Sequence, residues 1–296
     1  MKLLDVVVIG TGPSGIAAAI QLKRSGIEPI LIEKGEIGGL LRNAHLMENY
    51  PGFPEGICGQ KLADIFKKQL EIAGVKVHLE EVVECDYRNR MFIIQTNHRT
   101  LTAHIAVISS GTKPKKLSFP NTSADIDKDI FYEVYPLNQI TSEKIVVIGS
   151  GDIAFDYALN LASRGNHVTI LNRGEKAKCL PLLWERAMQA ERIDYRENTE
   201  IKSIQRQNKA LMLICSDSTG KCRVSARYLV VAIGREPCLG FLSENLRNNL
   251  GKLQKSHMLY MIGDVKNNIY RQAAVAVGEG IRAAMEIHHR IKRREL

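Results

Sequence analysis

The stretch "DVVVIGTGPSGIAAAIQLKRSGIEPILIEKG", residues 5–35, decides the fold. It predicts an apolar strand, a glycine turn, an alanine-rich helix and a second strand. Gly10, Gly12 and Gly15 form the pattern G-x-G-x-x-G. The first glycine makes the turn, the second lets a pyrophosphate approach the backbone, and the third lets helix and strand pack closely. Glu33 ends the second strand, where a carboxylate binds ribose hydroxyls. The stretch therefore predicts a dinucleotide-binding unit with the phosphates at the helix N-terminus.

The chain contains this unit a second time, at residues 144–174, "KIVVIGSGDIAFDYALNLASRGNHVTILNRG". Its glycine motif is G-x-G-x-x-A, made by Gly149, Gly151 and Ala154. Strand, turn, helix and strand follow in the same order and at similar spacing. Two copies predict two nucleotide sites.

The two copies differ where a ribose would bind. Twenty-three residues after the first glycine, the first copy has Glu33 and the second has Asn172. Arg173 follows, with Lys176 and Lys178 close behind. Cations replace the acid where a 2′-phosphate must be bound, so this pattern favours NADPH over NADH. Ordinary surface cations would look the same, and NADH stays open as an alternative.

Each copy is followed by a β-rich segment, residues 75–111 and 193–234, that ends in an apolar strand and a glycine, Gly111 or Gly234. After the second segment, "LYMIGDVKNNIYRQAAVAVGEG" predicts a strand, then Asp264, then a long helix whose first turn is near residues 270–273. An Asp at a strand end is an acceptor for sugar or ribityl hydroxyls, although it also caps helices.

These elements predict an α/β protein with two Rossmann-like, three-layer ββα dinucleotide-binding domains, the second inserted into the first. Residues 1–113 and 244–296 are expected to form the first domain, and residues 117–241 the second. Between Gly111 and Ile145, prolines and polar loops indicate a crossover linker.

Composition limits the alternatives. The length of 296 residues suits two domains. No apolar run reaches membrane-helix length and no signal peptide precedes the first strand, so we expect a cytoplasmic protein without membrane contact. The six cysteines show no metal-ligand spacing, and no metal is expected. The net charge of +9 favours acidic partners or phosphorylated ligands, whereas no motif supports nucleic-acid binding.

The segments "GTGPSG…IEK", "GGLL…MENYPGFPEG", "GSGDIA", "AIGREP" and "GDVKNNIYRQAAVAVGEG" resemble the class II, thioredoxin-reductase-like flavoproteins of the pyridine nucleotide-disulfide oxidoreductase superfamily. The resemblance covers nearly the whole chain. It implies a homodimer with FAD in the first domain and NAD(P)H in the second. The residues implied to bind FAD are Gly10, Gly12, Pro13, Ser14, Gly15, Glu33, Lys34, Gly39, Leu41, Asn49, Gly111, Asp264, Arg271, Gln272 and Ala273. Those implied to bind the pyridine nucleotide are Gly149, Gly151, Asp152, Ile153, Ala154, Asn172, Arg173, Lys178 and Gly234.

The chain departs from thioredoxin reductases at their redox cysteines. These enzymes carry Cys-x-x-Cys-Asp with the second cysteine about fourteen residues before the second glycine motif. Counting back from Gly149 reaches Tyr135, with Tyr132 three residues earlier and Pro136 in place of the acid. Tyrosine cannot exchange thiols, so the internal electron relay is expected to be absent. The two tyrosines could instead cover the flavin, limit oxygen access or donate a hydrogen bond to it, or simply pack.

Other thiols offer alternatives. Cys58 lies at the start of an amphipathic helix, where the dipole can lower a thiol pKa. Cys215 and Cys222 flank a turn and could face each other across a hairpin, although packing is the simpler reading. The apolar stripe of the helix after Cys58 is expected to contain Leu62, Ile65, Phe66 and Leu70.

The leading hypothesis is an FAD-dependent NAD(P)H oxidoreductase that passes electrons from FAD directly to an external acceptor. A ferredoxin or flavodoxin–NADP reductase is one alternative, since a basic protein suits an acidic carrier. The short tail "IKRREL" lacks the aromatic extension usual in those enzymes, which keeps a small-molecule acceptor open. The other alternative is an FAD-binding sensor or subunit with little turnover.

Overall fold

The structure is a computed structural model that describes residues 3–117 and 124–293. The chain divides into two compact units. Unit 1 comprises the described residues of 1–42, 47–113 and 236–296, and unit 2 those of 43–46 and 114–235. The first and the last described segments therefore both belong to unit 1, and most of unit 2 is one continuous insertion.

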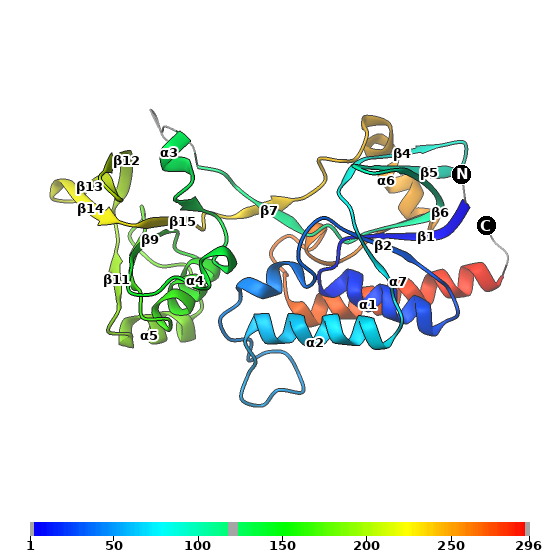
Figure 1. Ribbon diagram of the computed structural model, residues 1–296, viewed down its shortest axis with the longest axis horizontal. Helices are drawn as coiled ribbons and strands as arrows, with labels where there is room; N and C mark the ends of the chain where they lie inside the picture. Colours follow the sequence, from blue (N-terminus) through cyan, green and yellow to red (C-terminus); the bar gives the residue numbers. More distant parts are fainter. Residues whose placement is uncertain (1–2, 118–123, 294–296) are drawn as a thin grey trace. The chain divides into compact units, whose positions relative to one another are not determined.

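A seven-stranded sheet forms the centre of unit 1 (Figure 1). Its strands are β1 (Leu3–Ile9), β2 (Ile30–Glu33), β3 (Val77–Leu79), β4 (Val82–Arg88), β5 (Met91–Thr96), β6 (Thr100–Ile108) and β17 (Leu259–Met261). The order is β3-β2-β1-β6-β5-β4, and β17 also pairs with β6. Strands β1, β2, β3, β6 and β17 pair in parallel, whereas β4 and β5 pair antiparallel and continue into β6.

Three layers make up unit 1. Helices α1 (Pro13–Arg24), α2 (Gly59–Ile72) and α7 (Ala273–Lys292) cover one face of the parallel strands (Figure 1). The β4–β5 hairpin and helix α6 (Glu244–Lys255) pack against the other face. Successive residues of β1 alternate between the two clusters, as the period of a strand requires.

One detail of the predicted α2 stripe is wrong. Leu62, Phe66 and Leu70 are buried as expected, but Ile65 is 40% exposed. At 3.6 residues per turn, residue 65 lies beside the stripe that positions 62, 66 and 70 define and points away from the sheet.

Unit 2 repeats the three-layer arrangement with different elements. Its parallel sheet has the order β11-β10-β9-β15-β8. The strands are β8 (Ile130–Phe131), β9 (Lys144–Ile148), β10 (His167–Leu171), β11 (Ile193–Arg196) and β15 (Tyr228–Val231). Helices α4 (Asp152–Ala162) and α5 (Pro181–Gln189) cover one face. The antiparallel strands β12 (Glu200–Gln207), β13 (Ala210–Asp217) and β14 (Gly220–Ala226) cover the other.

The remaining elements are short: β7 (Thr112–Pro114), β16 (Arg235–Pro237), α3 (Ala124–Asp127), η1 (Gly39–Asn43), η2 (Tyr135–Leu137) and η3 (Gly263–Val265). Strands β7 and β16, where the chain enters and leaves unit 2, pair with each other. The stretch predicted as a linker contributes more than a connection, because β8 is the edge strand of the unit 2 sheet. Pro120 of that stretch lies outside the described residues.

The layers confirm the predicted class, an α/β protein built from two Rossmann-like dinucleotide-binding folds. No helix among the described residues is both long enough and apolar enough to cross a membrane.

Candidate nucleotide-binding sites

The glycine turn of unit 1 is sterically closed on one side and open on the other. Gly10 has φ +104°, and a Cβ there would lie 2.4 Å from the Ser109 carbonyl oxygen. A Cβ on Gly15 would lie 2.0 Å from the Gly10 carbonyl oxygen. At Gly12, by contrast, nothing lies within 4 Å of the Cβ position. The turn therefore requires glycine at its packed positions and leaves space beside Gly12, at the positive end of α1.

Glu33 is already oriented by its own loop. One carboxylate oxygen accepts hydrogen bonds from the Thr11 backbone N–H at 2.7 Å and the Thr11 hydroxyl at 2.8 Å. The other accepts from the Gly35 N–H at 2.9 Å. Thr11 was not predicted from the sequence; its position inside the glycine motif, between two glycines, was the available signal. The bonds fix the acid at the end of β2, next to the open side of the turn.

The C-terminal part of the chain packs tightly against the start of α1. A Cβ on Gly280 of α7 would lie 2.2 Å from the Ser14 carbonyl oxygen, and one on Gly263 would lie 2.5 Å from Ser14 Oγ. Glu279, another residue missed at the sequence level, accepts a hydrogen bond from the Gly263 N–H at 2.6 Å. Asp264 follows in η3. Residues distant in sequence therefore meet at the N-terminal end of α1.

The N-terminus of α7 contributes three of the predicted residues. Gln272 is the N-cap, and its side-chain oxygen accepts a hydrogen bond from Asn49 Nδ2 at 2.9 Å. The helix proper begins at Ala273, slightly later than predicted. Within the described part of the chain, the buried Nε of Arg271 has no hydrogen-bond partner. A buried donor without an acceptor is costly, which suits a site that an acceptor group of a ligand completes.

The other residues predicted for the first site are spread around this turn. Gly39 lies close to Gly12: a Cβ on Gly39 would be 3.5 Å from the Gly12 Cα. Leu41 is part of the apolar core, and Lys34 pairs with Glu81 at 3.6 Å. Pro13 begins α1, and Gly111 follows β6 with φ +62°.

The glycine turn of unit 2 has the same geometry. Gly149 has φ +147°, and a Cβ there would lie 2.4 Å from the Ala232 carbonyl oxygen. Gly151 has nothing within 4 Å of its Cβ position, like Gly12. The Ala154 Cβ lies only 3.1 Å from the same Cβ position of Gly149, so alanine at the third position of the motif is a further reason for glycine at the first.

Further predicted residues surround this second turn. Asp152, the first residue of α4, accepts a hydrogen bond from the Leu180 N–H at 2.8 Å. Ile153 is 37% exposed. Gly234 has φ +116°, and its carbonyl accepts from the Lys115 N–H at 2.9 Å.

The loop after β10 carries the predicted 2′-phosphate residues. Arg173 and Lys178 are exposed. Asn172 is buried, with its Nδ2 donating to the Lys176 carbonyl at 3.0 Å and to the Tyr195 hydroxyl at 2.8 Å. Contact between this amide and a nucleotide would compete with these bonds. The exposed cations are therefore the loop residues most available to a ligand.

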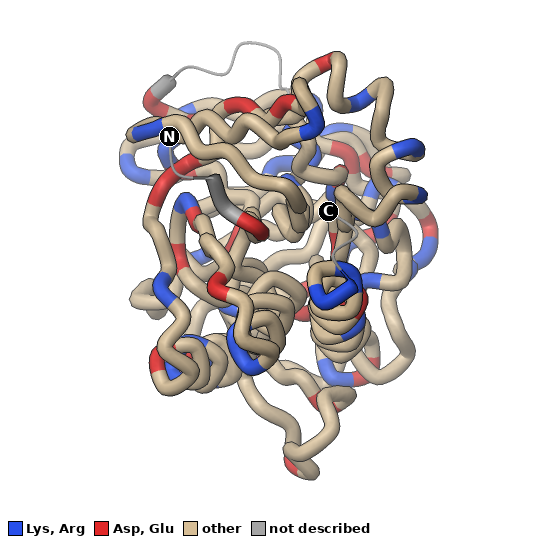
Figure 2. The backbone as a smooth tube through the Cα atoms, turned by 90° about the vertical axis from the view of Figure 1, so that its right-hand side faces the viewer, with Lys and Arg blue, Asp and Glu red and all other residues tan. Residues whose placement is uncertain are grey.

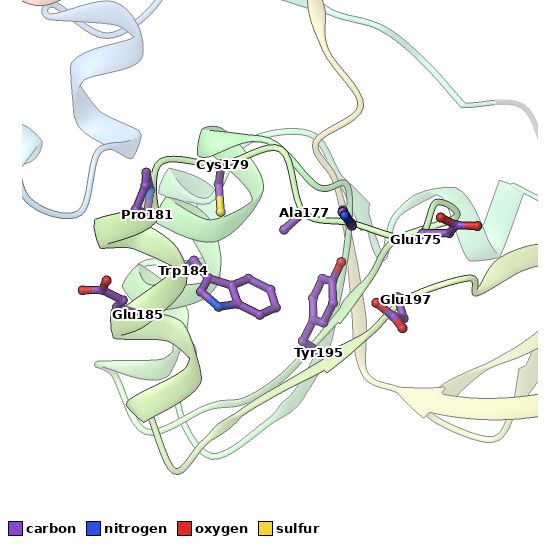
Figure 3. Close-up of a pocket in the computed structure, with 9 residues that line it drawn as sticks. Glu175, Ala177, Cys179, Pro181, Trp184, Glu185, Tyr195 and Glu197 are labelled. Carbon is purple, nitrogen blue, oxygen red and sulfur yellow. The ribbon is translucent and has the colours of Figure 1, made fainter.

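A cavity of about 410 Å³ adjoins the same loop (Figure 3). Its lining consists of Glu175, Lys176, Ala177, Cys179, Pro181, Trp184, Glu185, Tyr195 and Glu197. Trp184 and Tyr195 face each other edge to face with ring centroids 4.9 Å apart. Burial raises the pKa of the Cys179 thiol. With three carboxylates and one lysine, the lining is unfavourable for an anion.

The Tyr132–Tyr135 segment is bound firmly within unit 2. Asn43 Oδ1 accepts the backbone N–H groups of Val134 and Tyr135 at 3.1 and 2.9 Å. Tyr132 packs against the apolar cluster under β12–β14, which favours a packing role for it. Tyr135 begins η2. The buried amide of Asn43 was not predicted to be functional.

Between the tyrosines, Glu133 forms a partly buried polar cluster. Its carboxylate accepts a hydrogen bond from the Tyr157 hydroxyl at 2.6 Å and pairs with Arg235 at 2.6 Å. Burial, and next the nearby Glu133 charge, raise the pKa of Tyr157 well above its usual value. The cluster lies in the segment where relatives are expected to carry cysteines. The sequence could not predict it, because the partners of Glu133 come from α4 and β16, far along the chain.

Helix α4 contributes a second polar contact at Asp156. Its carboxylate accepts the His45 backbone N–H at 3.0 Å. Burial raises the pKa of Asp156 to about 6, while hydrogen bonds from the backbone of His45 and Leu46 oppose the shift. Asn160, one turn later, donates to the Asn43 carbonyl at 3.1 Å. Polar residues at spacing i, i+4 thus bind the 43–46 segment.

All six cysteines are free. Cys58 is exposed at the N-cap of α2. Cys215 and Cys222 are directly paired across β13 and β14, and burial raises the pKa of Cys215 to about 12, which disfavours its thiolate. Within residues 3–117 and 124–293, no group of three His, Cys, Asp or Glu side chains is placed to bind a metal ion.

Comparison with known proteins identifies the family. Residues 4–280 match the pyridine nucleotide-disulphide oxidoreductase family. The chain is 30% identical to the thioredoxin reductase of Chlamydia pneumoniae, with 95% of this chain and 96% of that protein covered. It is also 30% identical to the Neurospora crassa thioredoxin reductase, with 95% and 91% covered. The crystal structure of Lactococcus lactis thioredoxin reductase superposes with a TM-score of 0.85 at 27% identity, covering 98% and 99%.

The chain therefore belongs to the pyridine nucleotide-disulphide oxidoreductase family and has the fold of thioredoxin reductases. It is a flavoprotein oxidoreductase of this type. The cofactors of the thioredoxin reductase family are FAD and NADPH.

Proposed function

We propose that this protein is an FAD-dependent NAD(P)H oxidoreductase that passes electrons from reduced FAD directly to an external acceptor. A single observation carries the proposal. Where thioredoxin reductases are expected to have their cysteine pair, the sequence has Tyr132 and Tyr135, and no cysteine lies between Cys85 and Cys179. A phenol cannot form the disulfide that would receive electrons within the protein. Electrons on the flavin then have no thiol relay to follow along the chain.

For FAD, we propose the domain formed by residues 1–113 and 244–296. The open space beside Gly12 and the positive end of α1 suit a pyrophosphate, and the oriented carboxylate of Glu33 suits a ribose diol. The unpartnered Nε of Arg271 suits an acceptor on the flavin. Bound FAD supplies the hydride and electron-transfer chemistry, while these side chains bind and orient it.

For the pyridine nucleotide, we propose the domain of residues 117–241, with NADPH preferred over NADH. The space beside Gly151 repeats that beside Gly12. No acid stands at the end of β10, and the exposed Arg173 and Lys178 offer charge-assisted hydrogen bonds to a 2′-phosphate. Because the Asn172 side chain is hydrogen-bonded to the Lys176 carbonyl and the Tyr195 hydroxyl, we propose that it maintains the conformation of the loop and does not contact the ribose.

The acceptor is proposed to approach from outside the chain. Lys and Arg alternate with Asp and Glu along the backbone (Figure 2), and the net charge is +9. This balance favours an acidic electron carrier, ferredoxin or flavodoxin, whose association would weaken in salt. A small-molecule disulfide or quinone is the alternative acceptor. We further propose that the protein is a cytoplasmic homodimer.

Anaerobic mixing of the purified holoprotein with NADPH or NADH tests the proposal. We expect NADPH to bleach the flavin absorbance rapidly and NADH to do so more slowly. Failure of both nucleotides would reject the enzyme and favour a flavin-binding sensor. Reoxidation of the reduced flavin by ferredoxin, flavodoxin, quinones and disulfides, measured at low and high salt, would then identify the acceptor class.

A further inference from the structure

The loop between β10 and α5, residues 172–180, presents three exposed cations, Arg173, Lys176 and Lys178, of which Lys176 lines the cavity beneath the loop. Its far end is attached to the glycine turn of unit 2. The Lys178 N–H donates to the Ser150 carbonyl at 2.6 Å, and the Leu180 N–H donates to Asp152 at 2.8 Å. The near end, which carries Arg173, has no such bond to the turn among the described contacts. Backbone bonds attach it to β11 and the residues that follow: the Asn172 N–H donates to the Arg196 carbonyl at 2.9 Å, and the Asn172 carbonyl accepts from the Thr199 N–H at 2.8 Å. The Asn172 side chain adds further bonds to these.

Asn172 is 4% exposed, and both halves of its amide are used. Its Oδ1 accepts the Gly174 N–H at 3.0 Å. Its Nδ2 donates to the Lys176 carbonyl at 3.0 Å and to the Tyr195 hydroxyl at 2.8 Å. The first two bonds lie within the loop and curl it, whereas the third joins the loop to β11. The Tyr195 hydroxyl therefore adds a side-chain attachment between this curl and β11 to the backbone bonds that are already there.

Tyr195 is itself held in place by aromatic packing. Its ring meets Trp184 of α5 edge to face at 4.9 Å and lies 5.9 Å from the ring of Phe155 of α4. Figure 3 shows the Trp184 and Tyr195 rings side by side in the cavity beneath the loop. Burial raises the pKa of Tyr195, so the hydroxyl remains neutral at physiological pH. A fixed, neutral hydroxyl is a suitable anchor for an amide donor.

The two sides of the loop carry opposite charge. The cavity beneath it carries the carboxylates of Glu175, Glu185 and Glu197, which repel a phosphate. Arg173 and Lys178 supply the opposite charge in the same loop. A shift of the curl relative to β11 would change the distance between these cations and a bound 2′-phosphate, while the glycine turn that binds the pyrophosphate would stay unchanged.

We infer that Tyr195 is a positioning residue for nucleotide specificity: through Asn172 it fixes the 172–180 loop so that Arg173 and Lys178 bind the 2′-phosphate of NADPH. The inference rests on the proposed preference for NADPH. Tyr195 itself does not contact the nucleotide in this account.

Titration calorimetry on the FAD-loaded protein tests this inference with adenosine 2′,5′-bisphosphate and 5′-AMP, which differ only by the 2′-phosphate. Tyr195→Phe removes the hydroxyl and keeps the ring. We expect it to weaken binding of the bisphosphate about three- to tenfold, the effect of one lost hydrogen bond, and to leave 5′-AMP within about twofold. Tyr228→Phe, at another tyrosine of unit 2, is the matched control and should change neither affinity.

Each other outcome overturns the inference. Unchanged bisphosphate binding in Tyr195→Phe would show that the hydroxyl does not position the loop. Equal weakening of both ligands would show a general packing role instead. If the unaltered protein binds both ligands equally, the proposed NADPH preference fails first, and the inference fails with it; this case is recognised without any variant.

Discussion

The two glycine-turn helices, α1 in unit 1 and α4 in unit 2, begin alike but are covered in opposite ways. Against α1, the backbone of α7 approaches so closely that a methyl group on Gly280 would lie 2.2 Å from the Ser14 carbonyl oxygen. Against α4, the covering segments are held by polar side chains: Asp156, Tyr157 and Asn160 each bind a group outside the helix.

The two helices therefore depend on different kinds of interaction. Helix α7 is held against α1 by close backbone packing. The stability of this contact should therefore fall when side-chain volume is added and should depend little on pH. The segments packed on α4 are held by a largely buried carboxylate and by hydrogen bonds. The stability of these contacts should therefore change with protonation and little with small changes of side-chain volume.

The largest expected effect is on the steric side. Gly280→Ala should destabilise unit 1 by about 2–3 kcal/mol, since the new methyl overlaps a rigid backbone carbonyl. Release of FAD, followed by the rise in flavin fluorescence on heating, measures the loss. Gly278→Ala on the same helix is the matched control, because nothing lies within 4 Å of its Cβ position. It should be neutral or stabilising by about 0.5–1 kcal/mol. Equal melting of the two variants would contradict the close packing of α7 on α1.

The next effect concerns the polar side. The pKa of Asp156 is raised from 3.8 to about 6, so the folded state disfavours its charged form. Its contribution to stability is therefore full below about pH 4 and is lost as pH rises through about 6. Asp156→Asn removes the charge and keeps an acceptor oxygen. The variant should be more stable than the unaltered protein by about 1–2 kcal/mol at pH 8, with the gain vanishing near pH 4.

Urea unfolding followed by tryptophan fluorescence measures this difference selectively, because Trp184 is the only tryptophan in the sequence and lies in unit 2. Asp194→Asn replaces an exposed carboxylate of the same unit and should show no such pH dependence. If Asp156→Asn instead loses stability relative to the unaltered protein as the pH rises from 4 to 8, the folded state favours the charged carboxylate. The predicted pH dependence of the contacts on α4 would then be wrong.

The smallest expected effect concerns the chemical difference between the two units at the ribose position, where unit 1 has an acid and unit 2 has cations. Arg173→Ala should raise the KM for NADPH about tenfold and leave that for NADH within about twofold, because only the former carries a 2′-phosphate. Steady-state flavin reduction with both nucleotides measures this. Lys209→Ala removes an exposed cation at the β12–β13 turn and should change neither value. Equal changes for both nucleotides in Arg173→Ala would remove the basis for the NADPH assignment.

Much of the fold followed from local pattern. Both strand–turn–helix–strand units, their order and the three-layer class could be predicted because glycine spacing and apolar periodicity are local signals. The role of residues 130–137 could not, since a two-residue edge strand and a short η2 have too little periodicity to detect. Ile65 was misplaced for a similar reason: four apolar residues at helical spacing do not show which of them borders the stripe.

The sites were predictable only where the motif itself supplies the geometry. Gly10, Gly12 and Gly149 could be identified because a turn and a close approach require glycine. The partners that complete the sites could not, because Ser109, Glu279 and the aromatic anchor of Asn172 meet the motif only through tertiary packing. On α4, Asp156 and Asn160 gave a detectable sign, two polar residues at i, i+4 in an otherwise apolar helix, but their partners in the 43–46 segment are more than a hundred residues away.

Counting electrons tests whether the flavin lacks an internal thiol relay. Anaerobic titration of the fully oxidised holoprotein with dithionite gives the reducing equivalents taken up per FAD, and a thiol count on the denatured, unreduced protein accompanies it. We predict one electron pair per FAD, taken up by the flavin alone, and six free thiols per chain. Uptake of a second electron pair, with two thiols missing before reduction, would show that a disulfide in the chain accepts electrons from the flavin.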